Sequence, residues 1–230
     1  GRFGADDRLT FYAGRSDGNL TGNVAYSIPV NPWGGRVGVS YTEGKIKIIQ
    51  GPFVALDVTG RSSQAAINFS QPIWVTQNWL VLFNAAETEG KTVSRFATVA
   101  VTDDHYDKAT AGFSVTSSGN SYSITVSPAV NYIAWQDHVL GNNRAFNTYT
   151  GSLIATSTAG LANFSANVLA SWQYTQEKLL PGDQIFSIGG PTTVRGYPTN
   201  SASGDSGYYF NAELHYNWSA WLKGFDTYIF

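Results

Sequence analysis

Few residues of this sequence have the types and spacing that metal binding requires. The three histidines, His105, His138 and His215, share no metal-ligand spacing, and the chain has no cysteine. The segment from Asp103 to Asp107 is acidic enough for a cation but lacks the glycine and terminal glutamate of a calcium loop, so we expect a polar turn there. The pair Gly189-Gly190 is not followed by the Gly-Lys-Ser/Thr of a phosphate-binding loop. The sequence predicts no metal and no cofactor.

Catalysis by a nucleophile or by paired carboxylates has no better candidates. Ser187, Ser201 and Ser203 lack a Gly-x-Ser-x-Gly context, and none has an assigned histidine partner. Glu87 and Glu89 share a strand face, yet nothing specifies two carboxylates facing each other across a substrate. Arg195, taken alone, is typical of a solvated arginine between turn-forming residues. We therefore predict that the protein is not an enzyme.

The composition narrows the class of protein. Lys, Arg, Asp and Glu make up 13% of the 230 residues, about half the usual share, while aromatic residues reach 14%. Disordered chains are rich in charge and poor in aromatic residues, so the composition excludes disorder. The formal net charge of −2 carries no electrostatic footprint for nucleic acid. A chain this short of charge is expected where little of its surface faces bulk water.

Apolar and polar residues alternate with a period of two along most of the chain, which is the pattern of β-strands. Between Phe210 and Trp218, one face carries Phe210, Ala212, Leu214, Tyr216 and Trp218, and the other carries Asn211, Glu213, His215 and Asn217. Similar runs are Leu9–Gly14, Thr21–Ile28, Val37–Lys47, Ser62–Ser70, Trp79–Glu87, Val93–Thr102, Ala109–Ser117, Tyr122–Val130, Tyr149–Thr156 and Asn163–Thr175. No helical period and no apolar run of about 18 residues interrupts them. We predict one all-β domain, residues 1–230, with about eleven or twelve strands.

Two architectures fit this alternation: a soluble β-sandwich with a dry core, and a transmembrane antiparallel β-barrel with a polar lumen. The strands are long for a sandwich and near the length that crosses a membrane. Trp172 is mid-strand, but the other six tryptophans lie at strand ends or in turns, as in an aromatic girdle: Trp33, Trp74, Trp79, Trp135, Trp218 and Trp221. These features favour the barrel.

A family resemblance comes from a long segment in which the alternation stops, at about residues 176–206. This segment contains Gly189, Gly190 and the motif Val194-Arg195-Gly196-Tyr197. The motif is followed by Gly204-Asp205-Ser206-Gly207 and then by Glu213. With Leu180-Pro181-Gly182-Asp183-Gln184, this block resembles the C-terminal barrel region of the two-partner secretion transporters (TpsB). These belong to the superfamily of POTRA-bearing outer-membrane barrels that includes BamA. Upstream, only Ser27-Ile28-Pro29-Val30 adds to the match.

The resemblance implies that the long loop inserts into the barrel lumen and places Arg195 against the inner wall. A guanidinium group removed from bulk water needs a carboxylate partner. Glu213 belongs to the polar face of its strand, so its carboxylate is available to form a bidentate ion pair with the Arg195 guanidinium. We expect Gly196 to let the tip turn where a Cβ would clash, and Tyr197 to pack on the wall. The family also uses an Asp on the following strand, which we expect this sequence to lack.

The resemblance also implies a function. Family members are outer-membrane pores of Gram-negative bacteria that secrete a large partner exoprotein of the haemolysin or adhesin type, and POTRA domains are expected in the full-length protein. Because a family barrel has about sixteen strands, we expect an incomplete portion of one here, in contact with outer-membrane lipid. The alternatives are a BamA-like barrel that inserts other barrels, and a soluble β-sandwich domain acting on carbohydrate.

Overall fold

The computed structural model describes residues 6–49, 57–158, 163–190, 192–218 and 226–229. Within these ranges the regular elements are β-strands, as the alternation predicts. No helix in the described part of the chain is long and apolar enough to cross a membrane. The all-β prediction is therefore confirmed.

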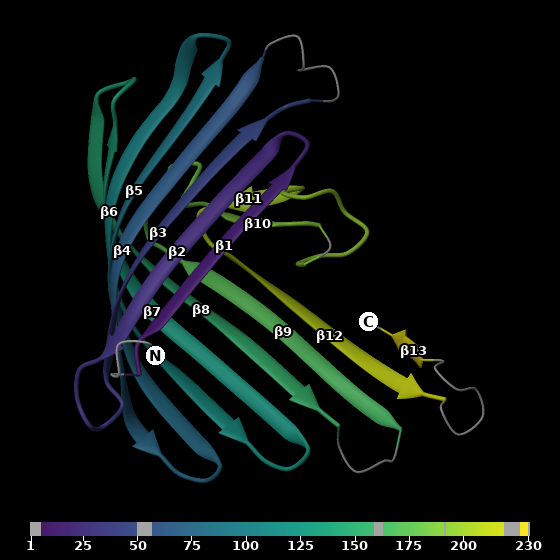
Figure 1. Cartoon of the computed structure of the whole chain (residues 1–230). Helices are drawn as coiled ribbons and strands as arrows, with labels where there is room; N and C mark the ends of the chain where they lie inside the picture. Colours follow the sequence, from purple (N-terminus) through teal and green to yellow (C-terminus); the bar gives the residue numbers. More distant parts are fainter. Residues whose placement is uncertain (1–5, 50–56, 159–162, 191, 219–225, 230) are drawn as a thin grey trace. The chain divides into compact units, whose positions relative to one another are not determined.

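Eleven strands form one sheet, and each long strand pairs with its neighbour in sequence (Figure 1). They are β1 (Arg8–Ser16), β2 (Asn19–Pro29), β3 (Arg36–Lys47), β4 (Val58–Val75), β5 (Trp79–Phe96), β6 (Val99–Ser118), β7 (Tyr122–Asp137), β8 (Asn142–Ser157), β9 (Phe164–Tyr174), β12 (Gly207–Asn217) and β13 (Asp226–Ile229). A separate two-stranded sheet pairs β10 (Phe186–Ile188) with β11 (Ala202–Gly204). A sandwich divides its strands between two large sheets. The single up-and-down order instead matches the predicted barrel.

The chain divides into two compact units, each built from several segments. Unit 1 contains residues 1–71, 84–111 and 131–146, and unit 2 contains residues 72–83, 112–130 and 147–230. The long strand β4 contributes to both units, so the division does not follow the ends of the strands. Each unit is described by itself below.

In unit 1 the strand register creates an apolar face. Cross-strand partners lie on the same side of a sheet, and one such row joins Leu9, Tyr26, Val39 and Ile67. Leu9 is 67% exposed and Ile67 is 61% exposed, so most of the surface of these two side chains is uncovered by protein. An uncovered apolar face of this kind is what a lipid-facing surface requires.

The opposite face of unit 1 is polar and holds the buried residues. Its row of partners is Tyr12, Asn23, Thr42 and Gln64, in which the Asn23 amide donates to the Thr42 hydroxyl at 2.8 Å. Gln64 donates to the Tyr106 hydroxyl at 2.6 Å, and Tyr106 is buried. Further buried residues of unit 1 are Asp104, Asn131, Ile133, Trp135, Asp137 and Phe146. A core with this many polar members resembles the filled inside of a barrel rather than the dry centre of a sandwich.

Trp135 corrects one expectation. Its indole is buried, with the Arg144 guanidinium 5.5 Å from the ring centroid, so it does not belong to an interfacial girdle. Trp33, Trp74 and Trp79 are exposed and Trp218 is partly exposed, whereas Trp221 lies outside the described residues. The position of a tryptophan at a strand end does not reveal which face of the sheet its side chain occupies. Trp135 occupies the face that holds the buried residues, and the prediction for it was therefore wrong.

Two expected boundaries were also wrong. The run Val93–Thr102 is not one strand, because β5 ends at Phe96 and β6 begins at Val99, with Ala97 at a φ of 51° in the turn between them. The acidic segment Asp103–Asp107 is not a turn but part of β6, which has 20 residues. The alternating pattern continues through the tight turn between β5 and β6, which has no glycine or proline to mark it. In β6, the strand continues through charged residues beyond its apolar part. Local composition therefore misplaced both boundaries.

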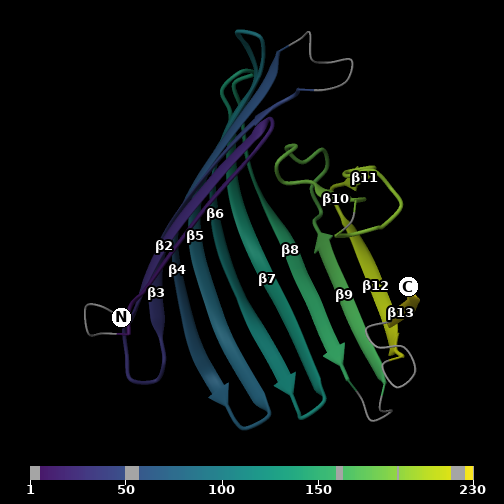
Figure 2. The ribbon, with the colours of Figure 1, turned by 45° about the vertical axis from the view of Figure 1, so that its right-hand side comes forward.

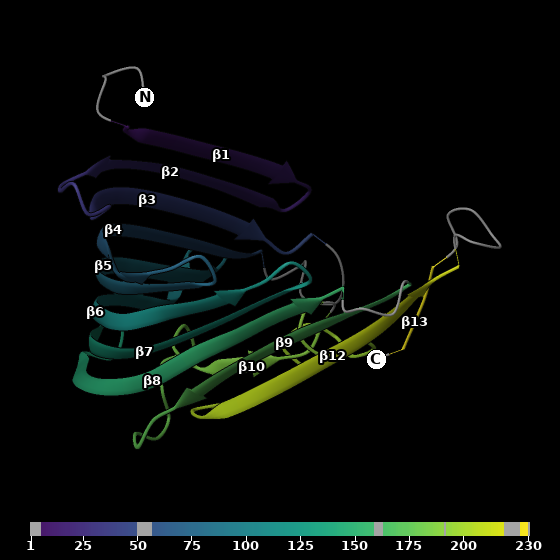
Figure 3. The same ribbon diagram turned by 90° about the horizontal axis from the view of Figure 1, so that it is seen from below.

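In unit 2, β12 lies between β9 and β13 (Figure 3). The pairing puts Ala212 opposite Val168 and Tyr216 opposite Phe164 on the apolar face, and Glu213 opposite Asn167 on the polar face. The rings of Phe164 and Tyr216 are 4.7 Å apart. β12 thus presents Glu213 on its polar side, as its alternation predicts.

Candidate functional site

The candidate site is the long loop that joins β9 to β12. Figure 2 shows its short hairpin, β10 and β11, beside the ends of β9 and β12 where the chain leaves one and enters the other. Ser187 pairs with Ser203 at the centre of this hairpin. The sequence predicts an irregular segment here, because a hairpin of two three-residue strands is too short to establish an alternating pattern. The loop nevertheless has a defined internal structure.

Asp205 closes the base of the loop. Its carboxylate accepts hydrogen bonds from the backbone N–H groups of Leu179 at 3.1 Å and Leu180 at 2.8 Å. The Gln173 side chain on β9 donates to the carbonyl oxygens of Gln184 at 2.9 Å and Asp205 at 3.0 Å. One acidic side chain and one amide thus tie both ends of the loop together. Bonds from a carboxylate to backbone N–H groups are among the stronger hydrogen bonds in proteins.

Gly189 and Gly190 make the turn that leads into the motif. Their φ angles are 115° and 95°, in the region that favours glycine. The Thr193 hydroxyl contacts both the N–H and the carbonyl of Gly189, each at 2.8 Å. The Gly190 N–H donates to the carbonyl of Tyr197 at 3.0 Å. These bonds fold the motif back on the two glycines.

The tip of the loop is joined to β12 by polar contacts. The Arg195 guanidinium forms an ion pair with the Glu213 carboxylate, and the Asn211 amide donates to the carbonyl of Thr193. The second oxygen of Glu213 is 3.2 Å from Nε2 of His215, whose ring stacks on Tyr228 at 5.3 Å. Glu213 therefore lies between a guanidinium and an imidazole, which fixes its carboxylate on the polar face of β12.

Burial differs between the two charged partners. The Glu213 side chain is 17% exposed and the Arg195 side chain is 43% exposed. The carboxylate is therefore the group that most needs the contact, because it has little access to water. The arginine retains partial hydration, so the pair is weaker than a fully buried one.

Two of the other three motif residues, Gly196 and Tyr197, differ from expectation. Gly196 has a φ of 85°, and no atom lies within 4 Å of where a Cβ would be. Backbone conformation, rather than a clash, therefore requires glycine at this position. Tyr197 is 64% exposed and does not show the expected packing against the wall. Val194 is half-buried.

Gly204 and Gly207 flank the return of the chain to β12. Gly204 is the end of β11, and an added Cβ at Gly207 would lie 2.7 Å from the ring of Phe186. Phe186 stacks on Tyr209 with ring centroids 6.3 Å apart. Gly207 thus lets the hairpin approach the start of β12.

The structure brings Arg195 and Glu213 together, and adds residues that sequence reasoning did not single out. These are Thr193 and Gln173, each of which makes two hydrogen bonds within the loop or its base. Asp205, which the sequence did single out, takes part in three. Asn211 had a usable signal, because it stands two residues before Glu213 on the same polar face. The arrangement holds a loop on a strand. Within the described ranges, no group of three or more His, Cys, Asp or Glu residues is arranged to hold a metal.

Comparison with known proteins agrees with these features. Residues 3–230 match the model of the family described as haemolysin secretion/activation protein ShlB/FhaC/HecB. The chain belongs to this family. This is the two-partner secretion family that the motif resembles, so the family prediction is confirmed.

Among solved structures, CdiB from Acinetobacter baumannii is similar, with a TM-score of 0.68 and 20% sequence identity. The match covers 86% of this chain and 37% of that chain, so this chain spans little more than a third of the neighbour's length. The likeness shows the fold, an antiparallel β-barrel fold of which this chain is a portion. No curated protein sequence matches the chain at a significant level.

Proposed function

We propose that the full-length protein is an outer-membrane pore of a Gram-negative bacterium that secretes a large partner exoprotein. Membership of the haemolysin secretion/activation family supports this proposal. A secreted exoprotein is then the partner, and POTRA domains are expected elsewhere in the full-length protein. Neither the family match nor the structural neighbour favours a barrel-assembly protein instead.

The two faces of the sheet support a membrane location. The exposed row of Leu9, Val39 and Ile67 supplies the apolar surface that faces lipid. The opposite row of Asn23, Thr42 and Gln64 supplies neutral groups that hydrogen-bond. An unfolded polypeptide binds such groups weakly, since no fixed charge retains it, and so it can move along them.

The contact between Arg195 and Glu213 carries the proposal for the loop. In this proposal the loop at about residues 176–206 lies in the lumen and is anchored to the polar side of β12. The amide of Asn211 on the Thr193 carbonyl supports the same placement, because both contacts reach the same face of one strand. The loop then keeps the inner wall in register while the client passes.

The test is secretion by the full-length protein carrying Arg195→Ala, with its partner exoprotein, in a Gram-negative host. We expect less partner in the medium while the barrel still shows heat-shifted gel mobility, the sign of a folded outer-membrane barrel. Lys178→Ala is the matched control, because it removes another loop cation that is not a residue of the motif. Undiminished export by Arg195→Ala would overturn the role of the loop. Wild-type protein that exports no partner would overturn the function itself.

A further inference from the structure

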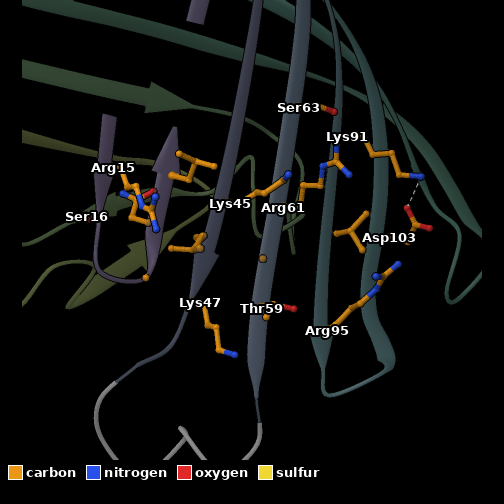
Figure 4. A pocket seen from close by; sticks show the side chains of 16 residues that line it. Arg15, Ser16, Lys45, Lys47, Thr59, Arg61, Ser63, Lys91, Arg95 and Asp103 are labelled. Atoms are coloured by element: carbon orange, nitrogen blue, oxygen red, sulfur yellow. Dashed lines mark ion pairs between the residues drawn. The ribbon is translucent and has the colours of Figure 1, made fainter. Parts of the chain in front are cut away.

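Unit 1 contains a basic pocket that plays no part in the proposed export mechanism. Its volume is about 970 Å³, and six of the fourteen Lys and Arg residues of the chain line it: Arg15, Lys45, Lys47, Arg61, Lys91 and Arg95 (Figure 4). Asp103 is the single acidic residue of the lining. In a chain whose charged residues are scarce, this concentration of one sign needs an explanation.

The register places these cations on the apolar face of the sheet. Arg15 pairs with Leu20, Leu20 with Lys45, and Lys45 with Arg61, so all four belong to one cross-strand row. Leu9 stands on the same face of β1 as Arg15, because their separation in sequence is even. The cations thus lie on the lipid-facing side, beyond its apolar part.

Nearby acidic residues do not balance the cluster. Glu43 forms ion pairs with Arg61 at 2.8 Å and with Lys45 at 3.5 Å. Two further ion pairs join Asp57 to Lys47 at 2.7 Å and Asp103 to Lys91 at 3.0 Å. Six cations therefore meet three carboxylates. Arg15 and Arg95 form no ion pair with any described residue. As far as the described residues go, these two exposed guanidinium groups keep hydrogen-bond donors for an anion.

The position along β5 indicates which end of the barrel this is. The face that carries Lys91 and Arg95 also carries Trp79, Val81 and Phe83 at the start of the strand. β5 has 18 residues, well beyond the nine to eleven that cross a membrane, and the excess lies at the pocket end. Outer-membrane barrels have short turns on the periplasmic side and longer loops outside the cell, and the longest connection between consecutive strands of unit 1, residues 48–57 between β3 and β4, starts at this end beside Lys47, so the pocket end corresponds to the extracellular side.

We propose that this pocket binds the headgroup of an outer-leaflet glycolipid that carries two phosphates. The inference rests on the proposed outer-membrane location. Arginine donates two parallel hydrogen bonds to one phosphate, and the cations are spread over β1, β3, β4 and β5, which is too wide for a single phosphate. Leu20 and Val93 add apolar lining, and the acyl chains then continue along the apolar face below. Lipid-facing cations at the membrane surface attract anionic lipid.

The test is native mass spectrometry of the full-length protein with diphosphorylated lipid A, dephosphorylated lipid A, phosphatidylglycerol or inorganic pyrophosphate. We expect selective binding of diphosphorylated lipid A, and about tenfold weaker binding by the double variant Arg15→Gln and Arg95→Gln. The variant Arg15→Lys and Arg95→Lys keeps both charges and should retain most of the affinity. Arg8→Gln with Lys178→Gln is the control, because it removes two cations outside the pocket, one of them at the other end of β1.

Each outcome decides the proposal. Equal binding by the Arg15→Gln and Arg95→Gln variant and the wild type overturns it. So does equal binding of phosphatidylglycerol, which means attraction by charge alone, or full competition by pyrophosphate, which means a site for free phosphate. Partner secretion is measured separately on the same proteins. Wild-type protein that secretes its partner but does not prefer the glycolipid refutes this inference and leaves the proposed function standing.

Discussion

Replacing Glu213 by glutamine should partly release the loop from β12. The substitution keeps the size of the side chain but removes the charge that pairs with Arg195 and contacts His215. A hydrogen bond to a charged group contributes about 1.5–3 kcal/mol, and the 43% exposure of Arg195 places this pair at the low end. A loss of about 1.5 kcal/mol lowers the ratio of docked to released loop roughly tenfold.

These 230 residues contain no cysteine, so cysteines introduced here add the only spin-label sites within them and make this change measurable. Spin labels at Thr192→Cys in the loop and Tyr208→Cys on β12 report the distance between the tip and the strand, and both positions are exposed. In the parent we expect one dominant short distance. Glu213→Gln should add a longer one whose weight gives the equilibrium, while Glu177→Gln, an exposed loop carboxylate, should leave the distribution unchanged.

A double-mutant cycle separates the ion pair from other effects of the substitution. Arg195→Gln, Glu213→Gln and the double variant are compared by the same distance measurement. Because each single change already breaks the pair, the double variant should be little worse than either, with a coupling of about 1.5 kcal/mol. Strictly additive effects, or a Glu213→Gln distribution that overlays the parent, would refute the reasoning.

Two further predictions concern the turn and the tip. Thr193→Val removes the hydroxyl that contacts both backbone groups of Gly189, so hydrogen exchange at the Gly189 amide should quicken by about fivefold or more, corresponding to about 1–3 kcal/mol; an unchanged rate would contradict this. Gly196→Ala meets no neighbouring atom yet should release the tip by about 1 kcal/mol because of its φ of 85°. Gly182→Ala, also in open space and without a positive φ, is its control, and equal spin-label distributions for the two would show that backbone conformation is not the constraint.

Alternation predicted the strands and the polar position of Glu213, because both follow from a period of two within one strand. It also placed Glu213, Asn211 and His215 on the same face, where the structure has them. Alternation does not indicate where a strand ends. The charged residues of β6 beyond its apolar part therefore suggested a turn at Asp103–Asp107, and the turn at Ala97 was hidden between two alternating runs.

The internal bonds of the loop were beyond sequence reasoning for a different reason. Gln173 and Asp205 are 32 residues apart, and the amide of one reaches the backbone of the other only after the hairpin has formed. Such a pair has no periodic signature. Trp135 shows that sequence reasoning is limited in the same way when it assigns a side chain to a face of the sheet. Tryptophan is typical of a membrane interface, and only the burial of Trp135 and its neighbours in the structure shows that its indole lies on the polar side of the sheet.

In the proposed arrangement, a loop anchored in a wet lumen must be held differently from an ordinary core element. A polar wall would offer little apolar area, so burial of Tyr197, which is 64% exposed, would not be available as an anchor. What remains are polar contacts, each contributing on the order of 1 kcal/mol: Thr193 with Gly189, Asn211 with Thr193, and Arg195 with Glu213. A loop held by a few such contacts is ordered at rest, yet its release requires only a few kcal/mol.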